Sequence, residues 1–114
     1  MASEIFGSAG SVVARLALDT GATHTAVNSS LLLRLGYHPL ASPNRVQVTT
    51  GSGVEYVPIV KISQLHALRN ERSDFDVMAH TFPTSATVDG VLGLDFLRGH
   101  ILTVDFRGGQ ISLE

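Results

Sequence analysis

Short stretches in which apolar and polar residues alternate recur along most of the chain. Residues 46–49 (VQVT) alternate cleanly, and residues 12–18 (VVARLAL) form a mainly apolar run that begins after a glycine-rich segment. Alternation with period two and apolar runs of this length are typical of β-strands. The predicted strands are residues 4–6, 12–18, 25–27, 46–49, 54–62, 64–68, 75–78, 101–105 and 110–113. Many short strands separated by turn signals predict a mostly β, barrel-like domain.

Two short segments favour helix instead. Residues 31–35 are almost all leucine, and Asn28, Ser29 and Ser30 before them are candidate N-caps. Gly36 follows this segment and suits the end of a helix. Residues 94–98 predict one or two further helical turns. We therefore expect one or two short helices packed against the sheet.

Turn signals divide the strands into hairpins. Residues 50–53 (TGSG) lie between two strand patterns, which predicts a mobile β-hairpin with a glycine-rich tip. Residues 69–72 (RNER) predict a charged turn, and residues 107–109 (RGG) predict the turn of a terminal hairpin that closes the domain. Residues 7–10 (GSAG) interrupt the start of the chain, so the first strand is expected to be short. Residues 1–11 are therefore the segment that the pattern determines least.

The composition fits one folded domain that spans residues 1–114. Apolar residues make up 44% of the chain and charged residues 16%, and a chain of this length buries roughly two-thirds of its unfolded surface. The net charge of −2 and the lack of a basic run argue against a nucleic-acid partner. The chain has no cysteine, which excludes disulfides and a thiol nucleophile.

No targeting or membrane signal stands out in the sequence. No apolar stretch is long enough to cross a bilayer, and residues 1–10 lack the charged start and apolar centre of a signal peptide. We expect no membrane contact within this segment, and the compartment stays unassigned. Met1-Ala2-Ser3 suggests a cloned start, and Leu113-Glu114 suggests the scar of an affinity tag. We therefore expect a domain excised from a longer protein, which could itself be anchored or exported.

Candidate chemistry lies where the apolar run at residues 12–18 ends, in Asp19-Thr20-Gly21-Ala22. Aspartate is depleted in strands and favoured in turns, so Asp19 marks the end of the strand and the start of a tight loop. A lone aspartate most often only caps such a loop. Two carboxylates that face each other across a water can hydrolyse a peptide bond, but the chain holds a single copy of this motif.

A second motif, Val91-Leu92-Gly93 followed by residues 94–97 (LDFL), comes later in the chain. Together with the Asp-Thr-Gly-Ala loop and the glycine hairpin, in this order, it resembles the retropepsin-like aspartic proteases of the bacterial, single-lobe type. The resemblance covers residues 12–113. It implies a closed, barrel-like acid-protease lobe with one or two short helices that functions as a two-fold homodimer, each subunit supplying one aspartate.

The resemblance implies specific roles for the aspartate loop. Asp19 would act as acid and base on a shared water, without a metal or cofactor, on an extended polypeptide substrate. Thr20 would hydrogen-bond across the dimer axis, Gly21 would offer its carbonyl to the substrate, and Ala22 would leave room beside the pocket. The loop is followed by Thr23 and His24, where viral members often carry acidic residues, so no substrate-binding role carries over to these two positions.

Other segments receive roles from the same resemblance. Gly51-Ser52-Gly53 would form the tip of a flap that closes over the substrate, and residues 91–93 would pack against the aspartate loop. Candidate residues of the substrate groove are Thr25, Val27 and Leu92. Because the dimer interface of this family uses terminal strands, the short first strand predicts either weak dimerisation or a truncated terminal segment.

The remaining ionisable residues are expected to be structural. Asp89, Asp95 and Asp105 fit a turn, an early helical position and a strand end, and Asp95 would favour a helix N-terminus electrostatically. The histidines show no metal-ligand spacing and are expected in exposed or loop positions; they are His24, His38, His66, His80 and His100.

Two alternatives to the protease remain open. The same fold could serve as a non-catalytic or latent module for peptide binding or dimerisation. The chain could also be an unrelated small β-barrel that carries the Asp-Thr-Gly motif by chance.

Overall fold

The computed structural model describes residues 1–114, except for the side chain of Thr50. The strands are β1 (Ala2–Gly7), β2 (Gly10–Leu18), β3 (Ala26–Asn28), β4 (Arg45–Thr50), β5 (Gly53–Ala67), β6 (Asn70–His80), β7 (Gly90–Leu92), β8 (Leu102–Asp105) and β9 (Gln110–Leu113). The helices are α1 (Ser29–Arg34) and α2 (Leu94–Leu97), with a 3₁₀ turn η1 (Pro39–Ala41) between α1 and β4. The predicted mostly β class is confirmed.

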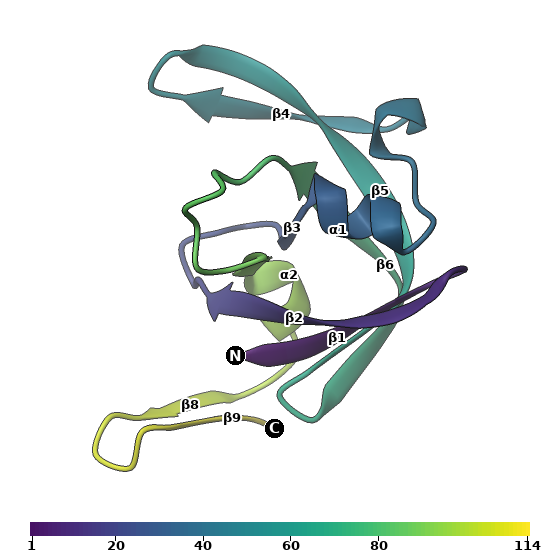
Figure 1. Cartoon of the computed structure of the whole chain (residues 1–114). Coiled ribbons are helices and arrows are strands. Elements are labelled where there is room, and N and C mark those ends of the chain that lie inside the picture. The colour runs from purple at the N-terminus through teal and green to yellow at the C-terminus, as the bar shows by residue number, and fades with distance from the viewer.

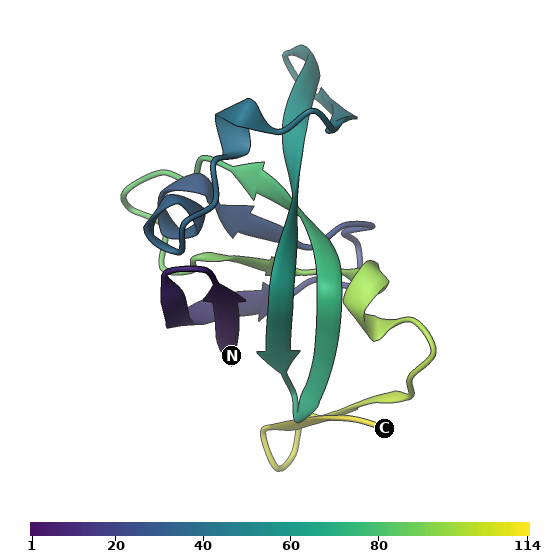
Figure 2. The ribbon, with the colours of Figure 1, turned by 90° about the vertical axis from the view of Figure 1, so that its right-hand side faces the viewer.

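Six strands close into a barrel in the order β1-β2-β7-β3-β6-β5, and β1 pairs with β5 to complete the ring. The pairs β2–β7 and β3–β6 are parallel, and the other pairs in the ring are antiparallel. β4 pairs with the first six residues of β5, so that the β4–β5 hairpin extends beyond the barrel (Figures 1 and 2). The barrel-like lobe predicted from the sequence is therefore the fold.

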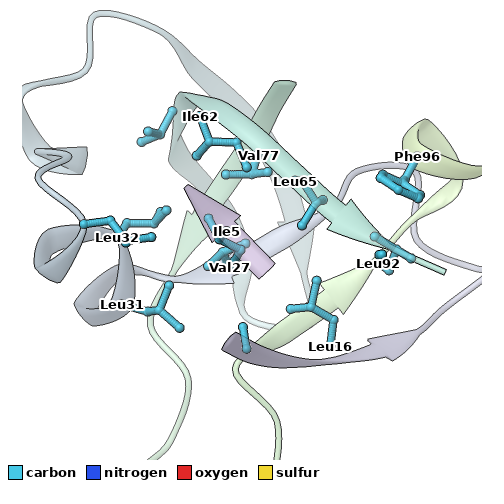
Figure 3. Packing of buried hydrophobic residues seen from close by; sticks show 14 of the residues in the cluster. Ile5, Leu16, Val27, Leu31, Leu32, Ile62, Leu65, Val77, Leu92 and Phe96 are labelled. Carbon is cyan, nitrogen blue, oxygen red and sulfur yellow. The ribbon is translucent and has the colours of Figure 1, made fainter. Parts of the chain in front are cut away.

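Apolar side chains from every side of the barrel fill its interior (Figure 3). Alternate residues of the strands point inward, as the period of a β-strand requires. The largest fully buried apolar side chains are Phe96, Ile5, Leu16, Leu31, Leu32, Ile62, Leu65, Leu92, Val27 and Val77. Helix α2 contributes Phe96 to this core, so the segment after β7 is anchored by apolar burial.

Helix α1 begins and ends as the sequence predicts. The Asn28 side chain accepts a hydrogen bond from the Ser30 amide and caps the first turn. Leu31 and Leu32 point into the core, and Gly36 follows the helix with a φ of 95°, a conformation that glycine adopts without strain.

The first strand is longer than predicted. β1 pairs with β2 along its whole length and with β5 on its other edge, so it is an integral strand of the barrel. Gly7 is the last residue of β1, and Ser8 and Ala9 form the turn that the glycine-rich segment predicts. A Cβ at Gly7 would collide with the Leu35 carbonyl and the Tyr37 ring, so this glycine also serves a close approach of two segments.

β5 is also a single strand, where the sequence predicts two. Pro58 pairs with Arg45 of β4, and the next residue, Ile59, pairs with Met78 of β6. The proline thus lies where β5 changes partners. The turn that follows consists of Leu68 and Arg69 rather than the predicted residues 69–72.

The terminal hairpin forms its own two-stranded sheet of β8 and β9, where the sequence predicts that it closes the domain. It leaves the barrel on the side of the β2–β3 loop (Figure 1). Leu113 is buried, and its carbonyl accepts a 3.2 Å hydrogen bond from the Asn70 side chain, which ties the hairpin to the start of β6. The barrel closes without it, through β1 and β5.

We expect Leu16→Ala to lower the free energy of unfolding by about 2–5 kcal/mol, because it leaves a cavity in the closed core. Urea unfolding followed by circular dichroism measures the change. Val13→Ala on the same strand is the matched control: Val13 is 69% exposed, so its loss should change stability by no more than about 0.5 kcal/mol. Equal effects of the two variants would contradict this view of the barrel interior.

Candidate active site

Asp19 lies directly after β2, on a tight loop that β7 holds in place. β2 and β7 run parallel with Leu18 opposite Leu92, and the Asp19 amide donates a 3.0 Å hydrogen bond to the Leu92 carbonyl. The Ala22 amide donates a 3.1 Å bond to the Asp19 carbonyl and closes the turn. Both backbone polar groups of Asp19 are therefore fixed.

The Asp19 carboxylate is exposed on the isolated subunit and has one backbone donor. Its Oδ1 accepts a 2.9 Å hydrogen bond from the Gly21 amide, the local pattern by which aspartate stabilises a turn. A Cβ at position 21 would lie 3.2 Å from this oxygen, so glycine keeps the approach open. Among the described residues no hydrogen bond to Oδ2 occurs, and Asp19 is exposed.

The structure brings residues 91–93 (VLG) against this loop. A Cβ at Gly93 would lie 2.8 Å from the backbone carbon of His24 and 2.9 Å from the carbonyl oxygen of Ala22. Only a glycine allows the two segments to approach this closely. The Leu94 amide adds a 2.8 Å hydrogen bond to the Ala22 carbonyl. Two motifs that are far apart in the sequence thus form one packed unit.

A buried polar network joins the far end of the loop to α2. The Thr25 hydroxyl donates a 2.7 Å hydrogen bond to Asp95 Oδ1 and accepts a 3.0 Å bond from the Gly93 amide. The Thr25 amide donates to both Asp95 oxygens at 3.0 Å. Asp95 lies in the first turn of α2, and its Oδ1 also accepts a 2.9 Å bond from the Phe96 amide. Sequence reasoning recognised the helix-end role of Asp95 but missed its bonds to Thr25.

The three predicted groove residues do not line an open groove. Thr25, Val27 and Leu92 have no exposed surface: Thr25 belongs to the polar network, and the other two side chains point into the core (Figure 3). The alternation of side chains along a strand explains the correction for Val27 and Leu92, which fall on the inner face of the barrel. Residues that contact a ligand must come from exposed positions.

The predicted flap is a β-hairpin that projects from the barrel. β4 and β5 pair from Arg45 opposite Pro58 to the end of the hairpin, and Gly51 and Ser52 form its two-residue turn. Gly53 follows with a φ of 136°, which favours glycine. The hairpin lies on the same side of the barrel as the Asp19 loop (Figure 1).

The other predicted positions differ in their surroundings. Thr20 is exposed, so a bond across a dimer axis stays a prediction. Asp89 accepts a 2.8 Å hydrogen bond from the Arg15 amide, and Asp105 accepts bonds from the amides of the β8–β9 turn. His66 differs from the expectation of an exposed or loop histidine, because it is half-buried in β5 and lies 3.1 Å from Glu71.

Metal-binding clusters and membrane-spanning helices are both absent from the described residues. No group of three or more histidine, aspartate or glutamate side chains among them is arranged to hold a metal ion. No helix in this part of the chain is both long enough and apolar enough to cross a membrane.

A protein-family model described as aspartyl protease matches residues 4–96. The match includes the Asp19 loop, the β4–β5 hairpin and β7, and it ends in α2, before the β8–β9 hairpin begins. Comparison with curated proteins found no relative that matches the chain. The family match excludes an unrelated barrel that carries the motif by chance.

We expect Thr25→Val to destabilise the protein by about 1–3 kcal/mol, because it leaves the buried Gly93 amide without an acceptor and removes a donor from Asp95. Thr25→Ser keeps the hydroxyl and should recover most of the loss. Thr23→Val is the control on the exposed part of the same loop, and urea unfolding measures all three. An equal loss for Thr25→Val and Thr23→Val would show that the network does not stabilise the loop.

Proposed function

The chain belongs to the aspartyl protease family, and on that premise we propose that it is an aspartic endopeptidase whose active site forms between two identical subunits. The observation that carries the proposal is the Asp19 carboxylate, exposed at the end of β2 on a loop that β7 fixes from below. The chain contains one Asp-Thr-Gly motif. Because the water-mediated chemistry needs two carboxylates, a second subunit must supply the other.

The paired carboxylates would share a proton. Two carboxylates about 3 Å apart cannot both ionise cheaply, so one stays protonated over a moderately acidic range. The ionised Asp19 takes a proton from the water as its oxygen attacks the peptide carbonyl, and the protonated Asp19 donates to the developing oxyanion. Return of a proton to the amide nitrogen then accompanies cleavage of the C–N bond. Thr20 braces the two loops, and Gly21 holds the substrate main chain.

The position of the β8–β9 hairpin supports a two-fold assembly. Each of its strands has a single strand partner in the described chain, so each offers a free edge. Val104, Ile111 and Phe106 are apolar and exposed, Phe106 to 93%. The hairpin leaves the barrel on the side of the Asp19 loop (Figure 1), and a second copy that covers it would bring the two loops together.

The β4–β5 hairpin is the flap of this proposal. It extends past the barrel on the side of Asp19 (Figure 1), and its backbone can hydrogen-bond to an extended peptide. Closure over the substrate would exclude water from the carboxylate pair and strengthen its electrostatic interactions.

The second candidate is a non-catalytic or latent module that binds a peptide or dimerises. It is favoured by the single carboxylate in each subunit, because a chain that stays monomeric has no acid–base pair. Oligomeric state and cleavage together separate the two candidates.

We expect Asp19→Asn to reduce cleavage of a broad peptide library by roughly 10³-fold or more, because the amide can neither share the proton nor activate water. Mass spectrometry of the products measures the loss. Asp76→Asn, which removes an exposed carboxylate paired with Lys61 at 3.3 Å, is the control and should keep activity. Wild-type activity should peak on the acidic side of neutrality; cleavage that survives Asp19→Asn, or that keeps rising into alkaline pH, would overturn the assignment.

We expect Val104→Glu to weaken dimerisation by at least roughly tenfold, because it places a like charge from each copy in an apolar contact between the hairpins. Sedimentation velocity over a concentration series measures the change, and activity should fall with the dimer fraction. Val13→Glu, at an exposed position of β2, is the matched control. A dimer that is insensitive to Val104→Glu would place the interface elsewhere.

A further inference from the structure

The β4–β5 hairpin has two chemically different faces. Val57 of β5 is buried, and Glu55, two residues earlier, shares its face because side chains alternate along a strand. Across the hairpin Val46 is opposite Val57 and Val48 is opposite Glu55. This underside, defined here by Val46, Val48, Glu55 and Val57, is the less exposed face of the hairpin, since Val46 and Val48 are half-buried and Val57 is buried.

The outer face of the same hairpin carries different residues. Thr49 lies opposite Val54, and Gln47 lies opposite Tyr56; all four side chains are exposed. Arg45 belongs to this outer face, and its guanidinium donates a 3.3 Å hydrogen bond to the Leu40 carbonyl. The nearest cation along the hairpin is therefore directed away from Glu55.

Glu55 is the only charged residue between positions 46 and 57. Its side chain is exposed, and no ion pair to it occurs among the side chains that the structure describes. It thus places an uncompensated negative charge beside Val48, on the underside of a hairpin that extends on the side of the Asp19 loop (Figure 1).

We propose that Glu55 selects peptides that carry lysine or arginine at the residue bound beneath the hairpin. This inference rests on the proposed function, in which the hairpin covers an extended peptide. The aliphatic stem of a basic side chain can pack on Val48 while its charged end reaches the Glu55 carboxylate. Closure of the hairpin removes water from the pair, which strengthens the attraction. Glu55 is then a specificity residue and takes no part in bond cleavage.

The test uses pools of blocked decapeptides in which one central position is lysine, arginine, norleucine or glutamate. Cleavage by the wild-type chain is measured by mass spectrometry, and binding of the same pools to the Asp19→Asn variant is measured by fluorescence anisotropy. We expect lysine and arginine to be preferred over norleucine at one position. Glu55→Gln should reduce this preference by roughly two- to fivefold, the range that partly exposed ion pairs give.

A matched control separates the position of the charge from the net charge. Glu55→Gln combined with Thr49→Glu keeps the number of carboxylates on the hairpin but moves one to its outer face. We expect this double variant to behave like Glu55→Gln, and Glu55→Lys to favour glutamate instead.

The outcomes for this inference and for the proposed function differ. Cleavage that survives Asp19→Asn overturns the proposed function. Cleavage that depends on Asp19 but shows no basic preference, or a preference that Glu55→Gln leaves intact, overturns the role of Glu55 alone. Restoration of the preference by Thr49→Glu would show a general charge effect and would also overturn it. Absence of a basic preference in both cleavage and binding overturns it as well.

Discussion

The parallel pairing of β2 with β7 is the constraint on which the rest of the structure depends. It places the Leu92 carbonyl where the Asp19 amide can bind it, so the reactive loop is positioned by barrel closure and not by its own turn alone. On its other edge β7 pairs with β3, and this pairing requires a glycine at position 90, where a Cβ would collide with the Ala26 carbonyl. Since β7 lies between β2 and β3, both ends of the loop depend on the same short strand.

The sequence predicts best where a local residue explains a local structure. Asn28 caps α1, and residues 51–52 turn the β4–β5 hairpin, because capping and tight turns depend on near neighbours. The turn at Leu68 and Arg69 escaped prediction because both residues have positive φ, of 52° and 61°, without glycine. Gly7 ends β1 as the turn signal predicts, but its close approach to Tyr37 is visible only in the folded chain.

The same distinction between local and distant interactions applies to the candidate active site. Asp19 at a strand end and the glycine of residues 91–93 follow from motif and turn chemistry, whereas the place of Thr25 does not. From the sequence alone, a threonine after a reactive loop fits a ligand groove and a buried hydrogen-bond network equally well. The burial of Thr25 decides between the two. Its hydroxyl can be buried because it donates a hydrogen bond to Asp95 and accepts one from the Gly93 amide. The place of Thr25 could not be predicted, because it depends on the Asp95 carboxylate, which is distant in the sequence.

The barrel core and the proposed dimer contact draw on different residues. The barrel is closed by β1 and β5 of the same subunit, and its apolar core is buried within that subunit. The hairpin of β8 and β9 lies outside this ring and exposes apolar side chains. On the proposed function, a subunit folds by itself and gains its second carboxylate only on association. Activity would then follow the dimer fraction, and hence concentration, and association of folded subunits would add to the apparent stability of the barrel.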